Sequence, residues 1–251
     1  AIYGSNAGYS PRGSITPPLK GFYADRIPPM EEYYLLVYKA MLRAIGRENP
    51  FNLTAVRLSG SEANFTISLP AAGETKWEWF VKNQFGDILQ KDSFRKTLQK
   101  GVNEIALDDF APPKYGDKLC LRLAVRTDRG LVLDLGEWAF ENRPSAEIVK
   151  FVAEKRYYDE GETVKFSGEI KGAADGAKLQ ITLIDHFGRH VASRELACAA
   201  NFAAEVKIEN ALVSKAYELR AALVENGREI SRRRAELIVR PDPQKDVWDD
   251  F

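Results

Sequence analysis

The hydrophobic positions of this chain change their period near residue 50. Between residues 30 and 45, apolar side chains recur every three or four residues, which predicts one α-helix. Pro28 and Pro29 suit its first turn, where a missing N–H has no partner in any case, and Gly46 suits its end. Because the helix is apolar over most of its surface, we expect it to dock against more than one partner, including a domain outside this chain. The residues expected to form these contacts are Tyr34, Leu35, Tyr38 and Leu42.

From residue 51 onward, apolar and polar residues alternate in short runs separated by turns rich in Gly, Asn and Asp. Seven runs with turns about 8–12 residues apart predict a β-sandwich. The alternation predicts that the first core includes Val56, Leu58, Phe65, Ile67, Leu69, Leu131, Leu133 and Leu135.

The same arrangement recurs in the second half of the chain. Phe85-Gly86 corresponds to Phe187-Gly188, 102 residues later, and Leu121-Arg122 corresponds to Leu219-Arg220, 98 residues later. Such spacing predicts a mainly β chain with two tandem immunoglobulin- or fibronectin-like sandwiches. The expected organisation is an extended segment and the helix in 1–50, sandwiches in 51–143 and 144–240, and a linker or docking tail in 241–251.

The repeat also bears on two tryptophans that share one strand face. Trp77 and Trp79 could form a platform on which a sugar stacks, but they align with Leu179 and Ile181, the apolar members of an alternating strand. A core position is therefore the favoured interpretation, and a ligand-binding platform is the alternative. Phe80 is expected on the opposite face, which makes it the better candidate for an aromatic residue that contacts a ligand.

Composition narrows the possible functions. Lys and Arg total 36, as do Asp and Glu, and a net charge of zero argues against nucleic-acid binding. No apolar run approaches the roughly 18 residues of a membrane span. The sequence contains neither a glycine-rich phosphate loop nor the serine elbow of hydrolases, so we predict no catalytic residue and no cofactor.

His186 and His190, with Asp185 beside them, have a spacing that could supply metal ligands. They span an expected turn, however, and no further His or suitably placed Cys completes a zinc site. An exposed turn is the favoured interpretation and no metal site is predicted. Cys120 and Cys198 fall at non-equivalent positions of different copies, which excludes a disulfide within either sandwich and predicts two small buried side chains.

The segment from Met30 to Glu48, MEEYYLLVYKAMLRAIGRE, resembles the closing helix of the glutamine-amidotransferase-like domain in large bacterial glycoside hydrolases related to β-galactosidases. The final residues, VWDDF, resemble the entry into a following catalytic barrel in such proteins, and Trp248 and Phe251 are the expected docking residues there. The resemblance covers only the edges of the chain. It implies a middle piece of a carbohydrate-active enzyme whose catalytic carboxylates lie elsewhere.

Two hypotheses follow. The first is a non-catalytic module of a carbohydrate-active enzyme that acts as a spacer, an interdomain brace or a polysaccharide binder. The second is an adhesion or assembly protein whose tandem sandwiches contact proteins. Both expect other domains or chains of a larger assembly as partners, no nucleic acid, and a secreted or periplasmic location. An enzyme active on its own ranks third.

Overall fold

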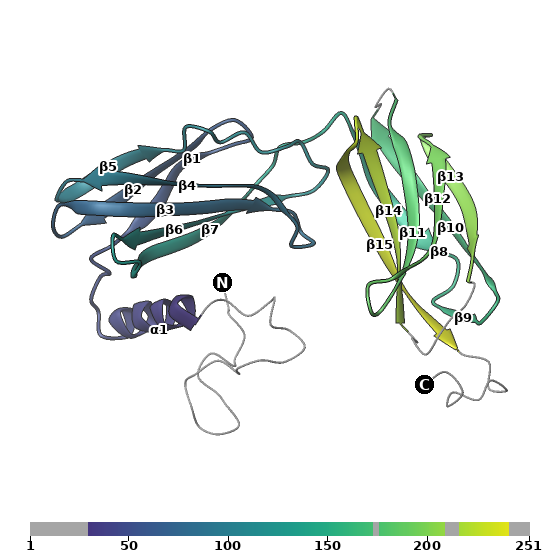
Figure 1. Cartoon of the computed structure of the whole chain (residues 1–251), viewed down its shortest axis with the longest axis horizontal. Helices are drawn as coiled ribbons and strands as arrows, with labels where there is room; N and C mark the ends of the chain where they lie inside the picture. The colour runs from purple at the N-terminus through teal and green to yellow at the C-terminus, as the bar shows by residue number, and fades with distance from the viewer. Residues whose placement is uncertain (1–29, 173–175, 209–215, 241–251) are drawn as a thin grey trace, which may run out of the picture. The chain divides into compact units, whose positions relative to one another are not determined.

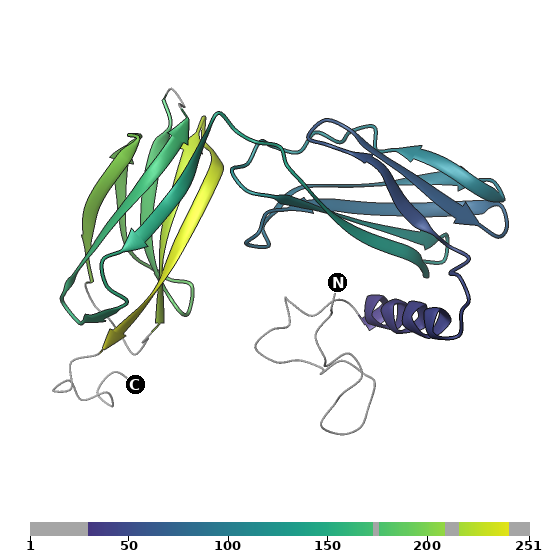
Figure 2. The ribbon, with the colours of Figure 1, turned by 180° about the vertical axis from the view of Figure 1, so that it is seen from behind.

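A computed structural model describes residues 30–172, 176–208 and 216–240 (Figures 1 and 2). By its internal contacts the chain divides into two compact units, Ala1–Pro112 with Cys120–Phe140, and Pro113–Leu119 with Glu141–Phe251. The elements found in the described residues are α1 (Met30–Ala44), β1 (Leu53–Leu58), β2 (Ala63–Leu69), β3 (Gly73–Lys82), β4 (Ile88–Leu98), β5 (Gly101–Ala106), β6 (Leu119–Thr127), β7 (Val132–Phe140), β8 (Ala146–Ala153), β9 (Tyr157–Asp159), β10 (Thr163–Gly172), β11 (Lys178–Asp185), β12 (His190–Ala197), β13 (Asn201–Lys207), β14 (Ala216–Glu225) and β15 (Arg228–Arg240).

The first sandwich, β1 to β7, has one sheet in the order β1-β2-β5 and a second in the order β4-β3-β6-β7. Alternate residues of β2 and β3 point into the space between the sheets, and Phe65, Ile67, Trp77 and Val81 are almost completely buried there. Burial of these side chains is the main stabilising contribution, roughly 1.5–3 kcal/mol for each aliphatic residue or phenylalanine.

The second sandwich, β8 to β15, repeats this plan with sheets ordered β13-β10-β8 and β12-β11-β14-β15-β9. The short strand β9 is an addition that pairs in parallel with the end of β15. Leu179, Ile181 and Leu183 of β11 are fully buried. The prediction of a mainly β chain with two tandem sandwiches and one helix is confirmed.

One hairpin is built in the same way in both sandwiches. In the first, the side-chain oxygen of Asn83 accepts hydrogen bonds from the backbone N–H groups of Phe85 and Asp87, at 2.9 and 3.0 Å. In the second, a carboxylate oxygen of Asp185 accepts from Phe187 and Arg189, both at 2.9 Å. Both acceptor side chains are buried, so each hairpin is held from inside by a single polar group.

Two strands of the first sandwich depart from the expected alternation. Val56 is 65% exposed, because β1 changes register between Ala55 and Arg57. Leu131 is 66% exposed and lies before β7, whose buried positions are Asp134 and Phe140 rather than leucines. The expectations for Val56 and Leu131 were therefore wrong, and Leu133 and Leu135 are only partly buried, whereas Trp138 packs against Phe65 and Phe140 is buried.

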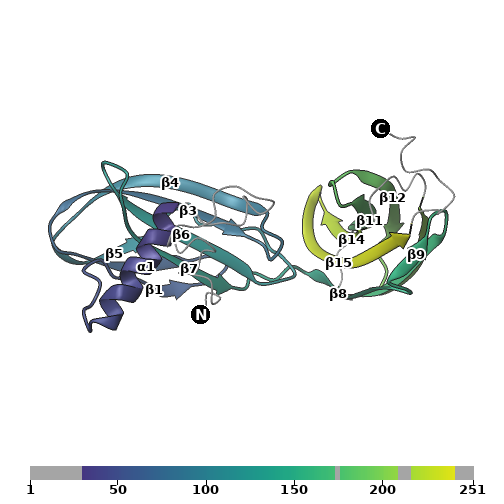
Figure 3. The same cartoon turned by 90° about the horizontal axis from the view of Figure 1, so that it is seen from below.

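Helix α1 lies on the outside of the first sandwich beside β7 (Figures 1 and 3). Its Lys39 pairs with the buried carboxylate of Asp134. The other oxygen of that carboxylate accepts a 2.9 Å hydrogen bond from the backbone N–H of Leu53, at the start of β1. Asp134 thus joins the helix, β1 and β7.

No helix in the part of the chain that the structure describes is long and apolar enough to cross a membrane.

The segment Pro113–Leu119 belongs to the second unit. Tyr115 is fully buried there, and its hydroxyl donates a 2.7 Å hydrogen bond to Glu229. The backbone N–H of Gly116 donates to the carbonyl of Ile230 at 2.7 Å. The range predicted for the first sandwich, 51–143, therefore includes a segment that packs in the second unit.

Both cysteines are free thiols, and each is partly rather than fully buried. The expectation of two buried side chains was therefore wrong, although Cys198 packs against the core of the second sandwich. Burial and the nearby Glu137 carboxylate raise the pKa of Cys120, which keeps this thiol protonated at neutral pH.

A candidate ligand-binding face on the first sandwich

The outward face of the sheet β4-β3-β6-β7 carries three rows of side chains that run across the strands. The register places Phe80 between Lys91 of β4 and Arg122 of β6. The next row has Glu78 between Ser93 and Ala124, and the third has Lys76 between Arg95 and Arg126. Directly paired residues in antiparallel strands point to the same side, so each row forms a band on the surface.

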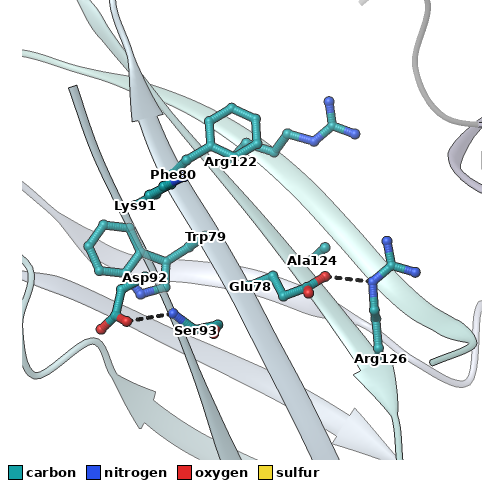
Figure 4. Close-up of a pocket in the computed structure, with 9 residues that line it drawn as sticks. All are labelled: Glu78, Trp79, Phe80, Lys91, Asp92, Ser93, Arg122, Ala124 and Arg126. Carbon is teal, nitrogen blue, oxygen red and sulfur yellow. Dashed lines mark hydrogen bonds and ion pairs between the residues drawn. The ribbon is translucent and has the colours of Figure 1, made fainter. Parts of the chain in front are cut away.

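The side chains of the middle row extend less far from the sheet, because Ser93 and Ala124 are small. The long side chains of the rows on either side leave a shallow hollow of about 500 Å³ above it. Figure 4 shows the residues around the hollow. Its lining consists of Glu78, Trp79, Phe80, Lys91, Asp92, Ser93, Arg122, Ala124 and Arg126.

Glu78 is held in place in this hollow by two cations. Its carboxylate lies 2.6 Å from the ammonium of Lys76. It also accepts a 2.7 Å hydrogen bond from the guanidinium of Arg126, which Figure 4 shows. These two contacts, with that of Lys76 the larger, outweigh partial burial and hold the pKa of Glu78 below its usual value. The carboxylate is therefore ionised at neutral pH and can accept hydrogen bonds from ligand hydroxyl groups.

Phe80 is a partly buried aromatic residue surrounded by positive charge. The guanidinium of Arg122 lies 5.7 Å from the centre of its ring, and the ammonium of Lys82 lies 5.9 Å away. Both cations also contact Glu137, at 3.6 and 3.1 Å. The ring thus orients two cations at the surface, besides offering apolar area of its own.

The structure separates the three aromatic residues that the sequence proposed for ligand binding. Trp77 is fully buried, and its indole N–H donates a 2.9 Å hydrogen bond to the hydroxyl of Thr75. Trp79 is 2% exposed and forms part of the floor of the hollow without offering a ring face. The alternative of a tryptophan platform was wrong, because both indoles belong to the core as the repeat indicated. Phe80 lies on the outward face, as expected.

The residues expected to dock a partner differ in how exposed their side chains are. Tyr34 and Tyr38 are 41% and 47% exposed, whereas Leu35 and Leu42 are partly covered. Met41 and Ile45, which were not proposed, extend the exposed side and are 63% and 65% exposed. The other two expected docking residues, Trp248 and Phe251, lie outside the described residues.

The histidine pair lies at the tip of the β11–β12 hairpin. The carboxylate of the preceding residue, Asp185, is already bound to two backbone N–H groups and to the guanidinium of Arg189 at 2.6 Å. The described residues contain no group of three His, Cys, Asp or Glu side chains that could hold a metal ion. The hairpin instead exposes Phe187, whose ring stacks on His186.

Sequence reasoning singled out Phe80 but none of the charged residues around it. Lys91, Arg122 and Arg126 come from two other strands, and only the register brings them to Phe80 and Glu78. The one available signal was the alternation of β3, in which Lys76, Glu78, Phe80 and Lys82 occupy the outward positions.

Comparison with known proteins adds little about function. No family model matches this chain, and no curated protein does. Among solved structures, it is similar to a tandem repeat of a large adhesion protein, with 14% identity over 74% of this chain and 48% of that chain and a TM-score of 0.32. It is also similar to a β-glucuronidase of Bifidobacterium dentium, with 12% identity over 71% and 39% of the two chains and a TM-score of 0.31.

A candidate β-galactosidase of Bacteroides fragilis is similar at 12% identity, over 75% of this chain and 34% of that chain, with a TM-score of 0.33. The chain therefore spans less than half of the length of each of these three proteins. At such TM-scores the likenesses carry no argument about activity or ligand. They show only weak similarity to parts of glycoside hydrolases and of an adhesion protein.

Proposed function

We propose that this chain is a non-catalytic β-sandwich module of a carbohydrate-active enzyme, and that the outward face of β4-β3-β6-β7 binds a glycan. The observation that carries the proposal is the hollow around Phe80 and Glu78. It combines an aromatic ring with a fixed carboxylate and a fixed guanidinium, which is the mixture of apolar area and oriented polar groups that ligand sites use.

A binding role fits the geometry better than catalysis. Retaining and inverting glycosidases require two carboxyl groups that face one another across the sugar, roughly 5–10 Å apart. Glu78 is neutralised by Lys76 and Arg126, and Asp92 accepts a 2.7 Å hydrogen bond from the backbone of Ser93. The two cations beside Glu78 lower its pKa, which is the opposite of what a general acid requires.

A screen of the intact chain against a glycan panel tests this function. We expect weak binding to at least one polysaccharide, and we expect Phe80→Ala to reduce that affinity about two- to tenfold, since an aromatic contact contributes about 0.5–1.5 kcal/mol. Phe187→Ala, at the exposed hairpin of the second sandwich, is the matched control and should bind as the wild type does. Absence of binding to every glycan by a folded protein would remove the glycan-binding role and leave that of a spacer.

A second candidate function is protein assembly, and one specific observation favours it. Tyr34, Tyr38, Met41 and Ile45 form an exposed apolar stripe along one side of α1. Such stripes are more typical of protein contacts than of sugar sites. Tyr38→Glu with Met41→Glu should abolish recovery of a partner from the native host and leave glycan binding intact. If the double variant still recovers the same partner, the stripe is not the contact.

A further inference from the structure

One segment of the chain packs away from the strands that flank it in sequence. Pro113–Leu119, which we call the strap, lies between β5 and β6 of the first sandwich but belongs to the second unit. The chain therefore passes from one unit to the other at three points, before Pro113, after Leu119 and after Phe140. A pair of domains joined by an ordinary linker has one such connection.

A buried ring and backbone hydrogen bonds hold the strap in the second unit. The side chain of Tyr115 is fully buried, and its hydroxyl donates a 2.7 Å hydrogen bond to Glu229. Its backbone N–H donates to the carbonyl of Asn142 at 2.7 Å, and that of Gly116 donates to the carbonyl of Ile230 at 2.7 Å. The strap thus contributes both to the core and to the hydrogen bonding of the second unit.

The strap also fits closely against β15. A Cβ atom at Gly116 would lie 2.7 Å from the hydroxyl oxygen of Ser231 and 2.9 Å from the Cβ of Glu147. The next residue, Asp117, pairs with the guanidinium of Arg233, and 16% and 27% of these two side chains are exposed. The second unit therefore has a site whose shape and charge match the strap.

The first sandwich holds the chain on both sides of the strap. Phe110, five residues before Tyr115, is buried, and its ring lies 5.6 Å from that of Trp79. Cys120, five residues after Tyr115, belongs to β6, which pairs with β3. While the first sandwich is folded, Tyr115 is therefore presented on a loop whose two ends are fixed. Few conformations remain to be lost when the strap docks.

Unfolding of the first sandwich would raise the entropic cost of docking the strap. The strap would then be part of a flexible chain, and placing Tyr115 against Asn142 would close a loop of 27 residues (142 − 115). The cost of closing a loop grows with the logarithm of its length, and ordering of the strap residues adds to it. The second sandwich would keep its site for the strap but would bind the strap less tightly.

We propose that the strap couples the stabilities of the two sandwiches, so that the second reaches its full stability only while the first is folded. Because such coupling is reciprocal, unfolding of the second sandwich destabilises the first by the same free energy. The tandem pair then responds to stress as one unit and not as two interchangeable modules. This inference does not depend on the proposed glycan binding, and it holds equally for a spacer.

Hydrogen exchange in the intact chain, followed by mass spectrometry, tests the coupling. Ile67→Asp with Trp77→Asp places two unpaired carboxylates in the first core and should unfold that sandwich, which complete exchange in β2 and β3 verifies. We expect the amides of β8 and β15 in the second sandwich then to exchange about tenfold faster or more. Lys114→Ala, at an exposed position of the strap, is the control and should leave this ratio unchanged.

A variant of the strap separates coupling from the ordinary loss of contacts. With Tyr115→Ala and Asp117→Ala, unfolding of the first sandwich should accelerate exchange in β15 less than about twofold. If these changes unfold the second sandwich, Asp117→Asn, which weakens the pair with Arg233, takes their place and should give a ratio below that of the wild type. Equal exchange in β8 and β15 with the first sandwich folded or unfolded would overturn the proposal. A ratio that stays unchanged in the strap variant would also overturn it, because the coupling would then have another route.

Discussion

Replacement of Asp134 should loosen the first sandwich at the point where α1, β1 and β7 meet. The carboxylate is 1% exposed and accepts hydrogen bonds from the backbone N–H groups of Leu53 and Leu135, at 2.9 and 2.7 Å, besides pairing with Lys39. Asp134→Ala leaves the Leu53 N–H buried without an acceptor, which costs about 1–3 kcal/mol. Loss of the charge-assisted contact to Lys39 adds about 1 kcal/mol, since that side chain is 32% exposed and partly screened by solvent.

We therefore expect Asp134→Ala to lower the free energy of unfolding by about 3 kcal/mol. Asp134→Asn keeps an oxygen for Leu53 and should cost about 1 kcal/mol less. Lys39→Met leaves the buried carboxylate without its cation, and combining it with Asp134→Asn should cost less than the sum of the two changes. Exchange of the α1 amide hydrogens should become faster in each of these variants.

Guanidinium unfolding followed by tryptophan emission reports mainly on the first sandwich, because three of the four tryptophans, Trp77, Trp79 and Trp138, lie there. The slope of the transition should stay unchanged if only stability is altered. Asp134→Ala and Asp134→Asn variants of equal stability, or a loss below about 1 kcal/mol for Asp134→Ala, would refute the role assigned to the buried carboxylate.

Three further predictions concern the cores and the hairpins. A Cβ atom at Gly116 would lie 2.7 Å from the hydroxyl oxygen of Ser231, so Gly116→Ala should destabilise the second unit by about 1–3 kcal/mol, measured as faster hydrogen exchange in β15. Trp77→Ala should cost about 3–5 kcal/mol in guanidinium unfolding, and a loss below about 2 kcal/mol would contradict its core position. Burial favours the neutral form of Asp185, but the backbone N–H and guanidinium of Arg189 hold its pKa below the usual value, so its stabilising contribution is present above about pH 4 and is lost as pH falls through the lowered pKa. Asp185→Asn, which copies Asn83, should therefore make the second sandwich less sensitive to acid between pH 5 and 3, and equal acid sensitivity of the two proteins would contradict this.

The sequence predicted the sandwiches because alternation and repeat spacing reflect local structure that the fold preserves. The alignment of Trp77 with Leu179 was enough to identify a core position. Alternation failed at Asp134, since a carboxylate on a strand is ordinarily exposed and nothing in the sequence indicates that Leu53 and Lys39 supply its partners. Val56 was misassigned for a similar reason, because a bulge inserts one residue and reverses the alternation beyond it.

The candidate face could be predicted only in part. The alternation of β3 placed Phe80 outward, but which residues of β4 and β6 lie beside it depends on strand register. A shift of one residue would have moved Lys91 and Arg122 to the other face. Register is fixed by the whole sandwich and its turns, so the rows around the hollow became visible only in three dimensions.

The two cores contain side chains of different size at equivalent positions, and this difference affects how the chain folds. Strands β3 and β11 occupy the same place in their sandwiches, but β3 contributes Trp77 and Trp79 where β11 contributes Leu179 and Ile181. Neighbouring domains with interchangeable strands can exchange them while both are unfolded, which is a common cause of misfolding in tandem arrays. Here β11 would leave voids in the first core, and β3 would overfill the second. The difference in side-chain volume thus helps each strand to return to its own sandwich.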